Sequence, residues 1–229
     1  MQTQKTRFVP MLFSTEMVEA ILNGTKTETR RIIKFPKDYD GKKVFDNGTL
    51  GIKYSSNDFE DCLKRLAPKI NINDIIWVRE TFQITDFLHP SDENYGYIYK
   101  ASENGKQWQN NSENWKWKPN IFMPKDACRI FLKCVSVHAE KLQDIDEQSA
   151  INEGIENMLL NVDTPATAYR NYMVTYKDFQ KDHWSHVAND AIDSYMTLWQ
   201  KINGKESWNE NPFVWVYKFE KIEKPNDFI

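Results

Sequence analysis

The sequence switches from helix to strand at Gly24, and this switch limits the fold more than any other feature. An apolar face recurs with helical spacing over residues 15–23, and Ser14 before it is a good N-cap. Gly24 stands where a left-handed residue commonly ends a helix. The β-branched residues of 27–33 then favour a strand. The pattern predicts an α+β fold in which polar groups converge at this junction.

The junction is rich in cations and hydroxyls. Alternation along a strand would divide its side chains into two faces, one with Lys26, Glu28 and Arg30 and the other with Thr27, Thr29 and Arg31. Lys26 and Thr29 can therefore meet only if the segment begins as a loop or carries a bulge. A solvated edge strand is the alternative to a functional site, because charged runs are usually surface.

The composition is that of a folded protein with no overall positive charge. The 229 residues are 40% hydrophobic and 14% aromatic, which suffices for one large domain or two small ones. Lys plus Arg number 30 and Asp plus Glu 33, a net charge of −3. Contact with nucleic acid would have to come from a local patch, and the cations between Lys26 and Lys37 supply a candidate.

Three cysteines without metal-ligand spacing fit a reduced, cytoplasmic setting. No apolar run approaches the ~18 residues of a membrane span, so we expect no membrane partner. His183 and His186 have helix-like ligand spacing but no third ligand nearby, and we expect no metal and no cofactor.

The remaining elements follow from local patterns. Strands are predicted at 8–13, 75–82, 97–99, 129–137 and 213–219, an Asn-Gly hairpin at 44–50, and helices at 58–66, 144–153 and 190–203. Asp144 is the expected cap of the second of these helices. Asn73 precedes the strand at 75–82, where it can tolerate positive φ.

Two further groups are candidates for binding. Glu80 falls on the apolar face of the strand at 75–82, so it either turns to water at a sheet edge or, if buried, needs a partner and lines a site. Trp115 and Trp117 would share a strand face beside lysines, an arrangement that suits base stacking. The alternative is that these aromatics anchor an insertion.

Glu153 is unusual for its position. It falls in the last turn of a helix that Gly154 ends, where an acid opposes the helix dipole at a cost of up to ~1 kcal/mol. A broken local rule is a mild sign of function, and a solvated helix end is the alternative.

Taken together, these segments resemble the ASCH domain, and most closely its longer phage and prophage members. The resemblance rests on the helix before Gly24, the Gly24-x-Lys26-Thr27-x-Thr29-x-Arg31 motif, Asp74-x-x-Trp77-Val78, Trp117-Lys118-Pro119 to Met123-Pro124, and Ala150-x-x-Glu153-Gly154. It covers a little under half of the chain. It implies a PUA-like mixed β-barrel flanked by short helices, as a single domain over 1–229 with insertions at about 34–72, 84–116 and 157–189.

The resemblance also implies a site in a cleft beside the barrel, and three functions compete for it. The first is binding of RNA or a modified nucleoside by Gly24, Thr27, Arg30, Arg31, Glu80, Trp115 and Trp117. The second is metal-independent hydrolysis of N4-acetylcytidine or a related N-acyl nucleoside, because Thr29 matches the amidohydrolase branch. There Lys26 would be the base, Thr29 the nucleophile and Glu153 the proton shuttle. The third is a phage accessory protein acting through protein contacts.

Overall fold

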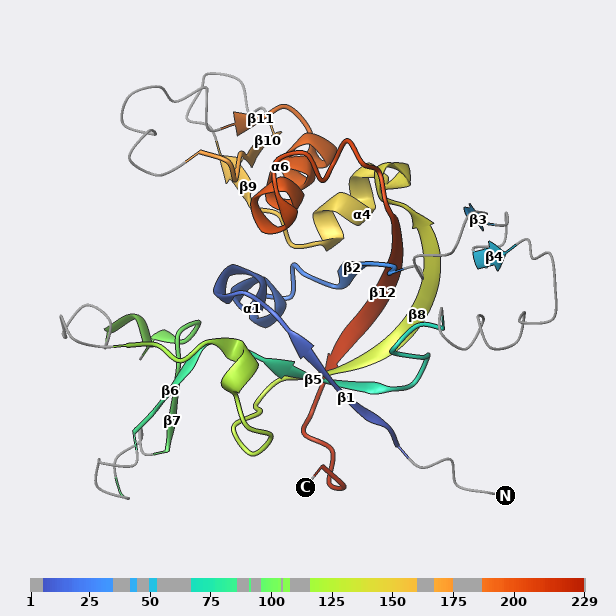
Figure 1. Ribbon diagram of the computed structural model, residues 1–229. Helices are drawn as coiled ribbons and strands as arrows, with labels where there is room; N and C mark the ends of the chain where they lie inside the picture. The colour runs from blue at the N-terminus through green and yellow to red at the C-terminus, as the bar shows by residue number, and fades with distance from the viewer. Residues whose placement is uncertain are drawn as a thin grey trace. The chain divides into compact units, whose positions relative to one another are not determined.

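The computed structural model describes residues 6–34, 42–44, 50–52, 67–85, 91, 96–103, 105–107, 116–159, 167–174 and 187–228 (Figure 1). The chain divides into two compact units. Unit 1 comprises residues 1–24, 72–135 and 219–229, and unit 2 comprises residues 25–71 and 136–218. The fold is mixed α+β, as predicted, with several sheets and few helices. Each unit is described by itself.

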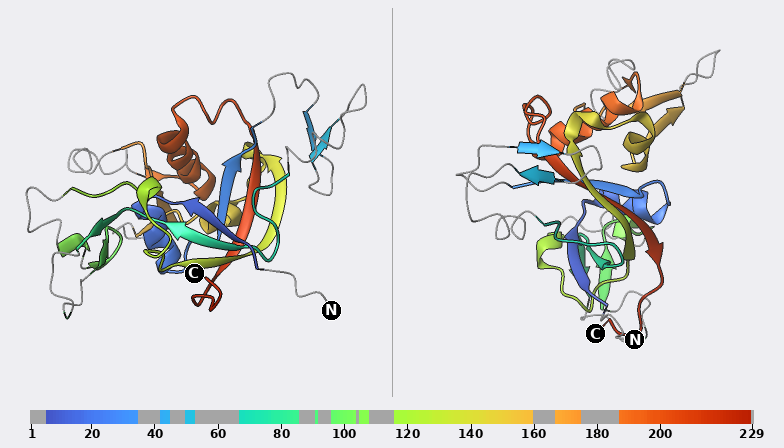
Figure 2. Two further views of the ribbon diagram at one scale, coloured as in Figure 1. Left: turned by 60° about the horizontal axis from the view of Figure 1, so that its bottom comes forward. Right: turned by 90° about the vertical axis from the view of Figure 1, so that its right-hand side faces the viewer.

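The principal sheet has five strands, hydrogen-bonded in the order β1-β5-β8-β12-β2. Their bounds are β1 Phe8–Leu12, β2 Glu28–Ile32, β5 Ile75–Arg79, β8 Phe131–Lys141 and β12 Phe213–Ile222. β1 runs parallel to β5, whereas β5–β8 and β12–β2 are antiparallel. β8 and β12 are the long curved strands of Figure 2, and they are neighbours in this order. The described strands form no closed barrel.

Three smaller sheets use short strands. β3 Lys42–Val44 pairs with β4 Leu50–Ile52, in agreement with the hairpin expected there, although residues 45–49 between them lie outside the described part. β6 Phe82–Ile84 pairs with β7 Tyr97–Tyr99. The third sheet joins β9 Asn157–Leu159, β10 Thr167–Arg170 and β11 Val187–Ala188.

Unit 1 contains the first helix and an aromatic core. Helix α1 (Thr15–Leu22) begins at the expected cap, since the Ser14 side chain accepts the Met17 N–H at 3.4 Å. A 3-10 turn, η1, covers Asn120–Phe122. The core includes Phe82, Met123 and Phe131, and Phe228 near the C-terminus packs edge-on against Phe131 at 4.7 Å between ring centroids.

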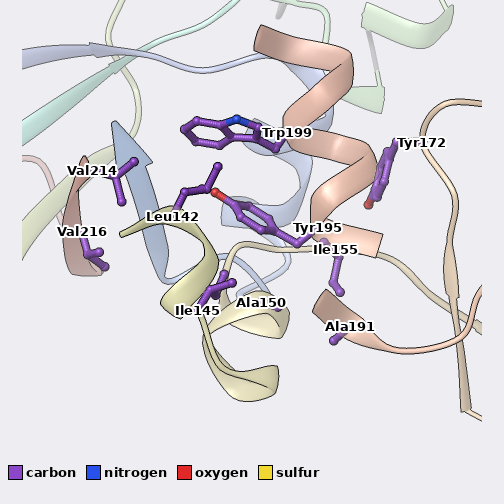
Figure 3. Packing of buried hydrophobic residues seen from close by; sticks show 10 residues of the cluster. All are labelled: Leu142, Ile145, Ala150, Ile155, Tyr172, Ala191, Tyr195, Trp199, Val214 and Val216. Carbon is purple, nitrogen blue, oxygen red and sulfur yellow. The ribbon is translucent and has the colours of Figure 1, made fainter. Parts of the chain in front are cut away.

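Unit 2 places its apolar core between two helices and the ends of β8 and β12. A 3-10 turn η2 (Leu142–Asp144) leads into α4 (Glu147–Asn152), and α6 spans Ala191–Asn203. Tyr195 and Trp199 extend from α6 among the buried residues that Figure 3 labels, with Leu142 close to the Tyr195 ring. α4 and α6 pack side by side (Figure 1).

Three local predictions need correction. The strand expected at 75–82 is interrupted at Glu80 and Thr81 and continues as β6. The cap of α4 is Asp146, whose carboxylate accepts the Ser149 N–H at 2.7 Å, because η2 takes up Asp144. The strand expected to end at Val137 continues to Lys141. Asn73 does adopt the positive φ (72°) that its position predicted.

No helix among the described residues is both long and apolar enough to cross a bilayer. The helix expected at 58–66 lies outside the described residues.

Candidate active site

The centre of the candidate site is an ion pair between Lys26 and Glu153 in unit 2. The Lys26 amine donates to the Glu153 carboxylate at 2.6 Å and to the Glu153 backbone carbonyl at 2.8 Å. The side chain of Lys26 is 0% exposed and that of Glu153 is 3% exposed. The two residues are 127 positions apart in sequence, so the fold, and not local structure, brings them together.

Each residue lies close to the end of a regular element: Lys26 just before the start of β2, and Glu153 at the end of α4. Lys26 precedes β2, and its backbone makes an isolated antiparallel bridge with Glu153. The neighbouring Thr27 N–H donates to the Asn152 carbonyl at 2.8 Å. Glu153 is the C-cap of α4, and Gly154 follows with φ 83°. The backbone bridge fixes the approach of the two chains, and the ion pair is made across it.

Arg30 is the hub of a wider network. Its guanidinium donates from Nη1 to Glu153 at 3.2 Å and from Nε to Glu140 on β8 at 2.8 Å. Nη1 also lies 3.6 Å from the Glu28 carboxylate. Arg30 thus contacts three carboxylates, and its planar fork has the donors that such a position requires. Its side chain is 2% exposed.

The outer carboxylates of the network have partners of their own. Glu28 accepts from Lys218 of β12 at 2.8 Å and from the Asn152 amide at 3.0 Å. Glu140 lies 3.2 Å from His138 Nε2. Among the described residues, the ion pairs of this network therefore join three cations, Lys26, Arg30 and Lys218, to three carboxylates, Glu28, Glu140 and Glu153.

Burial controls the protonation of the central amine. It lowers the pKa of Lys26 below its ordinary value of 10.5, because desolvation outweighs the attraction of Glu153, and Arg31 and Arg30 lower it further. Burial alone would also lower the pKa of Arg30, but Glu153, Tyr195 and Glu140 reverse the effect and raise it. Lys26 is therefore the member of this cationic pair that can lose its proton.

A tyrosine completes the surroundings of Glu153. The Tyr195 hydroxyl donates to the second Glu153 oxygen at 3.4 Å, and the Arg30 guanidinium lies 5.8 Å from the Tyr195 ring centroid. Burial raises the pKa of Tyr195 well above 10, and Glu153 raises it further. The hydroxyl therefore stays protonated and can act only as a donor to Glu153 at neutral pH.

The other motif residues lie around this pair. Thr29 is buried in β2 opposite Tyr217, and no hydrogen bond joins it to Lys26 in the described part of the chain. Arg31 is partly buried; desolvation lowers its pKa, against the opposing influence of Glu153. Thr27 is exposed, and Gly24 has the positive φ (76°) expected of a residue that ends a helix.

Glu80 belongs to a separate ion pair, in unit 1. It is 1% exposed, which excludes the alternative that it turns to water at a sheet edge, and its ion-pair partner is Arg129. The Arg129 guanidinium donates to both carboxylate oxygens, at 2.8 and 2.9 Å, and stacks 4.2 Å from the Tyr99 ring centroid. The Lys26 network, all within unit 2, does not include Glu80.

The tryptophans are described only in part. Trp117 is half-buried in unit 1, where the next residue, Lys118, makes a backbone bridge with Phe82 of β6. Trp115 lies outside the described residues, as do His183 and His186. No group of three metal-ligating side chains occurs among the residues that the structure describes.

Sequence reasoning missed four members of the network: Glu28, Glu140, Tyr195 and Lys218. Glu28 had a signal, since strand alternation puts it on the face of Lys26 and Arg30. Tyr195 lies in the apolar core that its helix helps to form, so its spacing in the sequence gives no sign of the contact that its hydroxyl makes with Glu153. Nothing local pointed to Glu140.

No protein-family model, no curated protein and no solved structure matches this chain.

Proposed function

We propose that unit 2 holds an N-acylated nucleoside and hydrolyses its amide with side chains alone, and that the chain is a divergent ASCH protein of PUA-like fold. The observation that carries the proposal is the 2.6 Å contact between a fully buried Lys26 amine and the Glu153 carboxylate. The resemblance assigns these two residues to one site.

The chemistry follows from the charge states of the pair. Lys26, with its lowered pKa, takes a proton from the nucleophile, which is the Thr29 hydroxyl or a water molecule. The nucleophile's oxygen bonds to the acyl carbon, and the C–N bond breaks as Glu153 passes the proton from Lys26 to the departing amine. If Thr29 attacks, water then cleaves the threonine ester. The products in either case are the free amine and a carboxylic acid, from amide plus water.

Burial strengthens each of these steps. Few water molecules screen charges in such a place, so the guanidinium of Arg30 and the hydroxyl of Tyr195 hold the Glu153 carboxylate in a fixed orientation. Arg31 is the cation we assign to the developing oxyanion, because it follows the motif threonine by two residues along β2 and so shares its side of the strand.

Binding of RNA by the motif cations is less well supported. Phosphate contacts need accessible cations, whereas Lys26 and Arg30 are buried and paired with carboxylates. We therefore assign the site to a nucleoside, either free or at an exposed position in RNA. Cys128 and Cys134 are buried thiols that form no disulfide, which agrees with our assignment of the reaction to a reducing, cytoplasmic setting.

The test is turnover of N4-acetylcytidine, both free and in a short RNA, followed by chromatography of released cytidine. We expect release by the full chain and a 10²–10⁴-fold loss of kcat in Lys26→Met, the range for removal of a general base. Thr29→Ser and Thr29→Val separate the two nucleophiles, since only the water route survives loss of the hydroxyl.

Lys106→Met is the matched control, because Lys106 is an exposed lysine of unit 1 that also forms ion pairs, with Glu19 and Glu103. It should hydrolyse at the wild-type rate. The proposal fails if the wild-type chain releases no cytidine at high concentration, or if Lys26→Met is as active as Lys106→Met. Either result leaves the Lys26–Glu153 pair as a structural contact.

A further inference from the structure

The Glu153 carboxylate is shared between two cations. One oxygen takes the Lys26 amine at 2.6 Å, and the other takes Arg30 Nη1 at 3.2 Å and the Tyr195 hydroxyl at 3.4 Å. A carboxylate divided in this way offers each cation less than its full charge. The division depends on where the Arg30 side chain is held.

Arg30 is also held by two carboxylates other than Glu153. Its Nε donates to Glu140 at 2.8 Å, a shorter contact than the one to Glu153, and its Nη1 lies near Glu28. Glu140 is the more exposed of the three carboxylates, with 18% of its side chain accessible, and it also contacts His138. Glu140 on β8, which holds Arg30, is therefore partly exposed at the protein surface, whereas the Lys26 amine that Arg30 influences is buried.

We propose that Arg30 is a positioning residue of this site: by sharing the Glu153 carboxylate with Lys26, it fixes the carboxylate and limits the negative charge available to the amine. The inference rests on the proposed hydrolysis and adds to it a residue that acts through another. Glu140 serves in turn to hold Arg30, and so to limit how strongly Arg30 competes for Glu153.

The charge balance supports this assignment. The ionisable groups of the network and its immediate surroundings come from five elements: Arg30, Arg31 and Glu28 on β2, Glu153 at the end of α4, Glu140 and His138 on β8, Tyr195 on α6, and Lys218 and Tyr217 on β12. Burial lowers the pKa of Lys26, Glu153 raises it, and Arg31 and Arg30 lower it again. Arg30 is hydrogen-bonded to the same carboxylate as Lys26.

Three substitutions separate charge from geometry. Arg30→Met removes the competing cation, so Lys26 should lose its proton at a higher pH than in the wild type. Glu140→Gln leaves Arg30 with one fewer carboxylate, so Lys26 should lose its proton at a lower pH. Arg30→Lys keeps the charge but cannot contact three carboxylates at once, so the titration of Lys26 should stay near the wild type while kcat falls roughly 10- to 100-fold through loss of positioning.

The measurement is the pH titration of the Lys26 side chain in the full chain, followed by the ¹³Cε chemical shift in protein labelled with ¹³C-lysine. Lys26→Met identifies the resonance by its absence. Backbone amide spectra establish that each variant is folded. If Arg30→Met does not fold, Glu140→Gln still tests the sign of the coupling, because its side chain is at the edge of the network.

Opposite displacements of the titration in Arg30→Met and Glu140→Gln support the inference. It is overturned by a titration in Arg30→Met at or below that of the wild type, by an unchanged titration in Glu140→Gln, or by full kcat in Arg30→Lys. The titrations do not depend on turnover. A wild-type chain that releases no cytidine would therefore defeat the hydrolysis proposal while the coupling between Arg30 and Lys26 was still decided by the midpoints.

Discussion

Replacing either partner of the buried Lys26–Glu153 ion pair should destabilise the protein, and replacing Glu153 should cost more than replacing Lys26. In Glu153→Gln, the Lys26 amine loses its charged partner and keeps only neutral acceptors such as the backbone carbonyl at 2.8 Å, while Arg30 retains Glu140 and Glu28. Two buried cations lose one charge partner. Removal of one member of a buried pair lowers the free energy of unfolding by about 3–5 kcal/mol. For a chain of this size that corresponds to a decrease in Tm of roughly 10 °C.

Lys26→Met should be milder. Methionine has nearly the length of lysine without the charge, so the packing volume is conserved. Glu153 keeps Arg30 at 3.2 Å and the Tyr195 hydroxyl at 3.4 Å, and only one acceptor oxygen loses its partner. We expect a loss of about 1–3 kcal/mol in the free energy of unfolding. The double variant should lose about as much as Lys26→Met alone, because no lysine charge is left without its carboxylate.

The assay is denaturant unfolding of the four proteins at pH 7, followed by circular dichroism, with Lys106→Met as the control. The two substitutions should be coupled by at least ~2 kcal/mol, at the upper part of the range seen for residues in one ion network. Additive losses, agreeing within ~0.5 kcal/mol, would show that Lys26 and Glu153 do not stabilise each other and would refute the reasoning.

Three further predictions concern single groups. Because burial lowers the pKa of Lys26, the unfolded chain binds one more proton than the folded protein between that lowered pKa and 10.5. The free energy of unfolding of the wild type should therefore rise relative to that of Lys26→Met as the pH increases through this window. Parallel curves of stability against pH for the two proteins would contradict the prediction. Burial raises the pKa of Cys128 to about 11, so iodoacetamide at pH 8 should label this thiol in urea but not in the native protein, as read by peptide mass spectrometry. Asp146→Ala removes the cap of α4 and should lower the free energy of unfolding by ~1 kcal/mol, whereas Asp146→Asn should not. Equal losses for the two variants in the same denaturant unfolding assay would exclude a capping role.

Local rules predicted the element types better than the element ends. The helix after Ser14, the hairpin pairing of Val44 with Leu50 and the positive φ of Asn73 all follow from residue chemistry within a few positions. The break of the strand at Glu80 does not. There the backbone N–H of Glu80 contacts the Met123 sulfur at 3.1 Å, a partner 43 positions away that no local pattern shows.

The candidate site was also predicted only in part, because local patterns grouped some of its residues and distant contacts supplied the others. Alternation along β2 correctly groups Lys26 with Arg30, since both contact Glu153. The choice of Glu153 as their partner came from the family resemblance and not from spacing. Glu140 was missed because β8 was expected to end at Val137, three residues short of it. A contact set by the length of a distant strand cannot be read from the residues around the motif.

The same unit shows that an apolar core was available to this sequence. Val214 and Val216 of β12, in register with Ile32 and Arg30 of β2, belong to a cluster with Tyr195 and Trp199 of α6 (Figure 3). Aliphatic side chains in place of a buried ion network are often as stable or more stable, because no charge needs to be desolvated. A chain that nevertheless buries two carboxylates, Glu28 and Glu153, and two cations, Lys26 and Arg30, beside such a cluster retains them at a cost to stability. Of the two buried cations Lys26 and Arg30, Lys26 is the one whose pKa is lowered, and an amine that can release its proton beside a carboxylate is what proton transfer requires. Stability alone gives no reason for that arrangement, whereas the amide hydrolysis that we propose gives one.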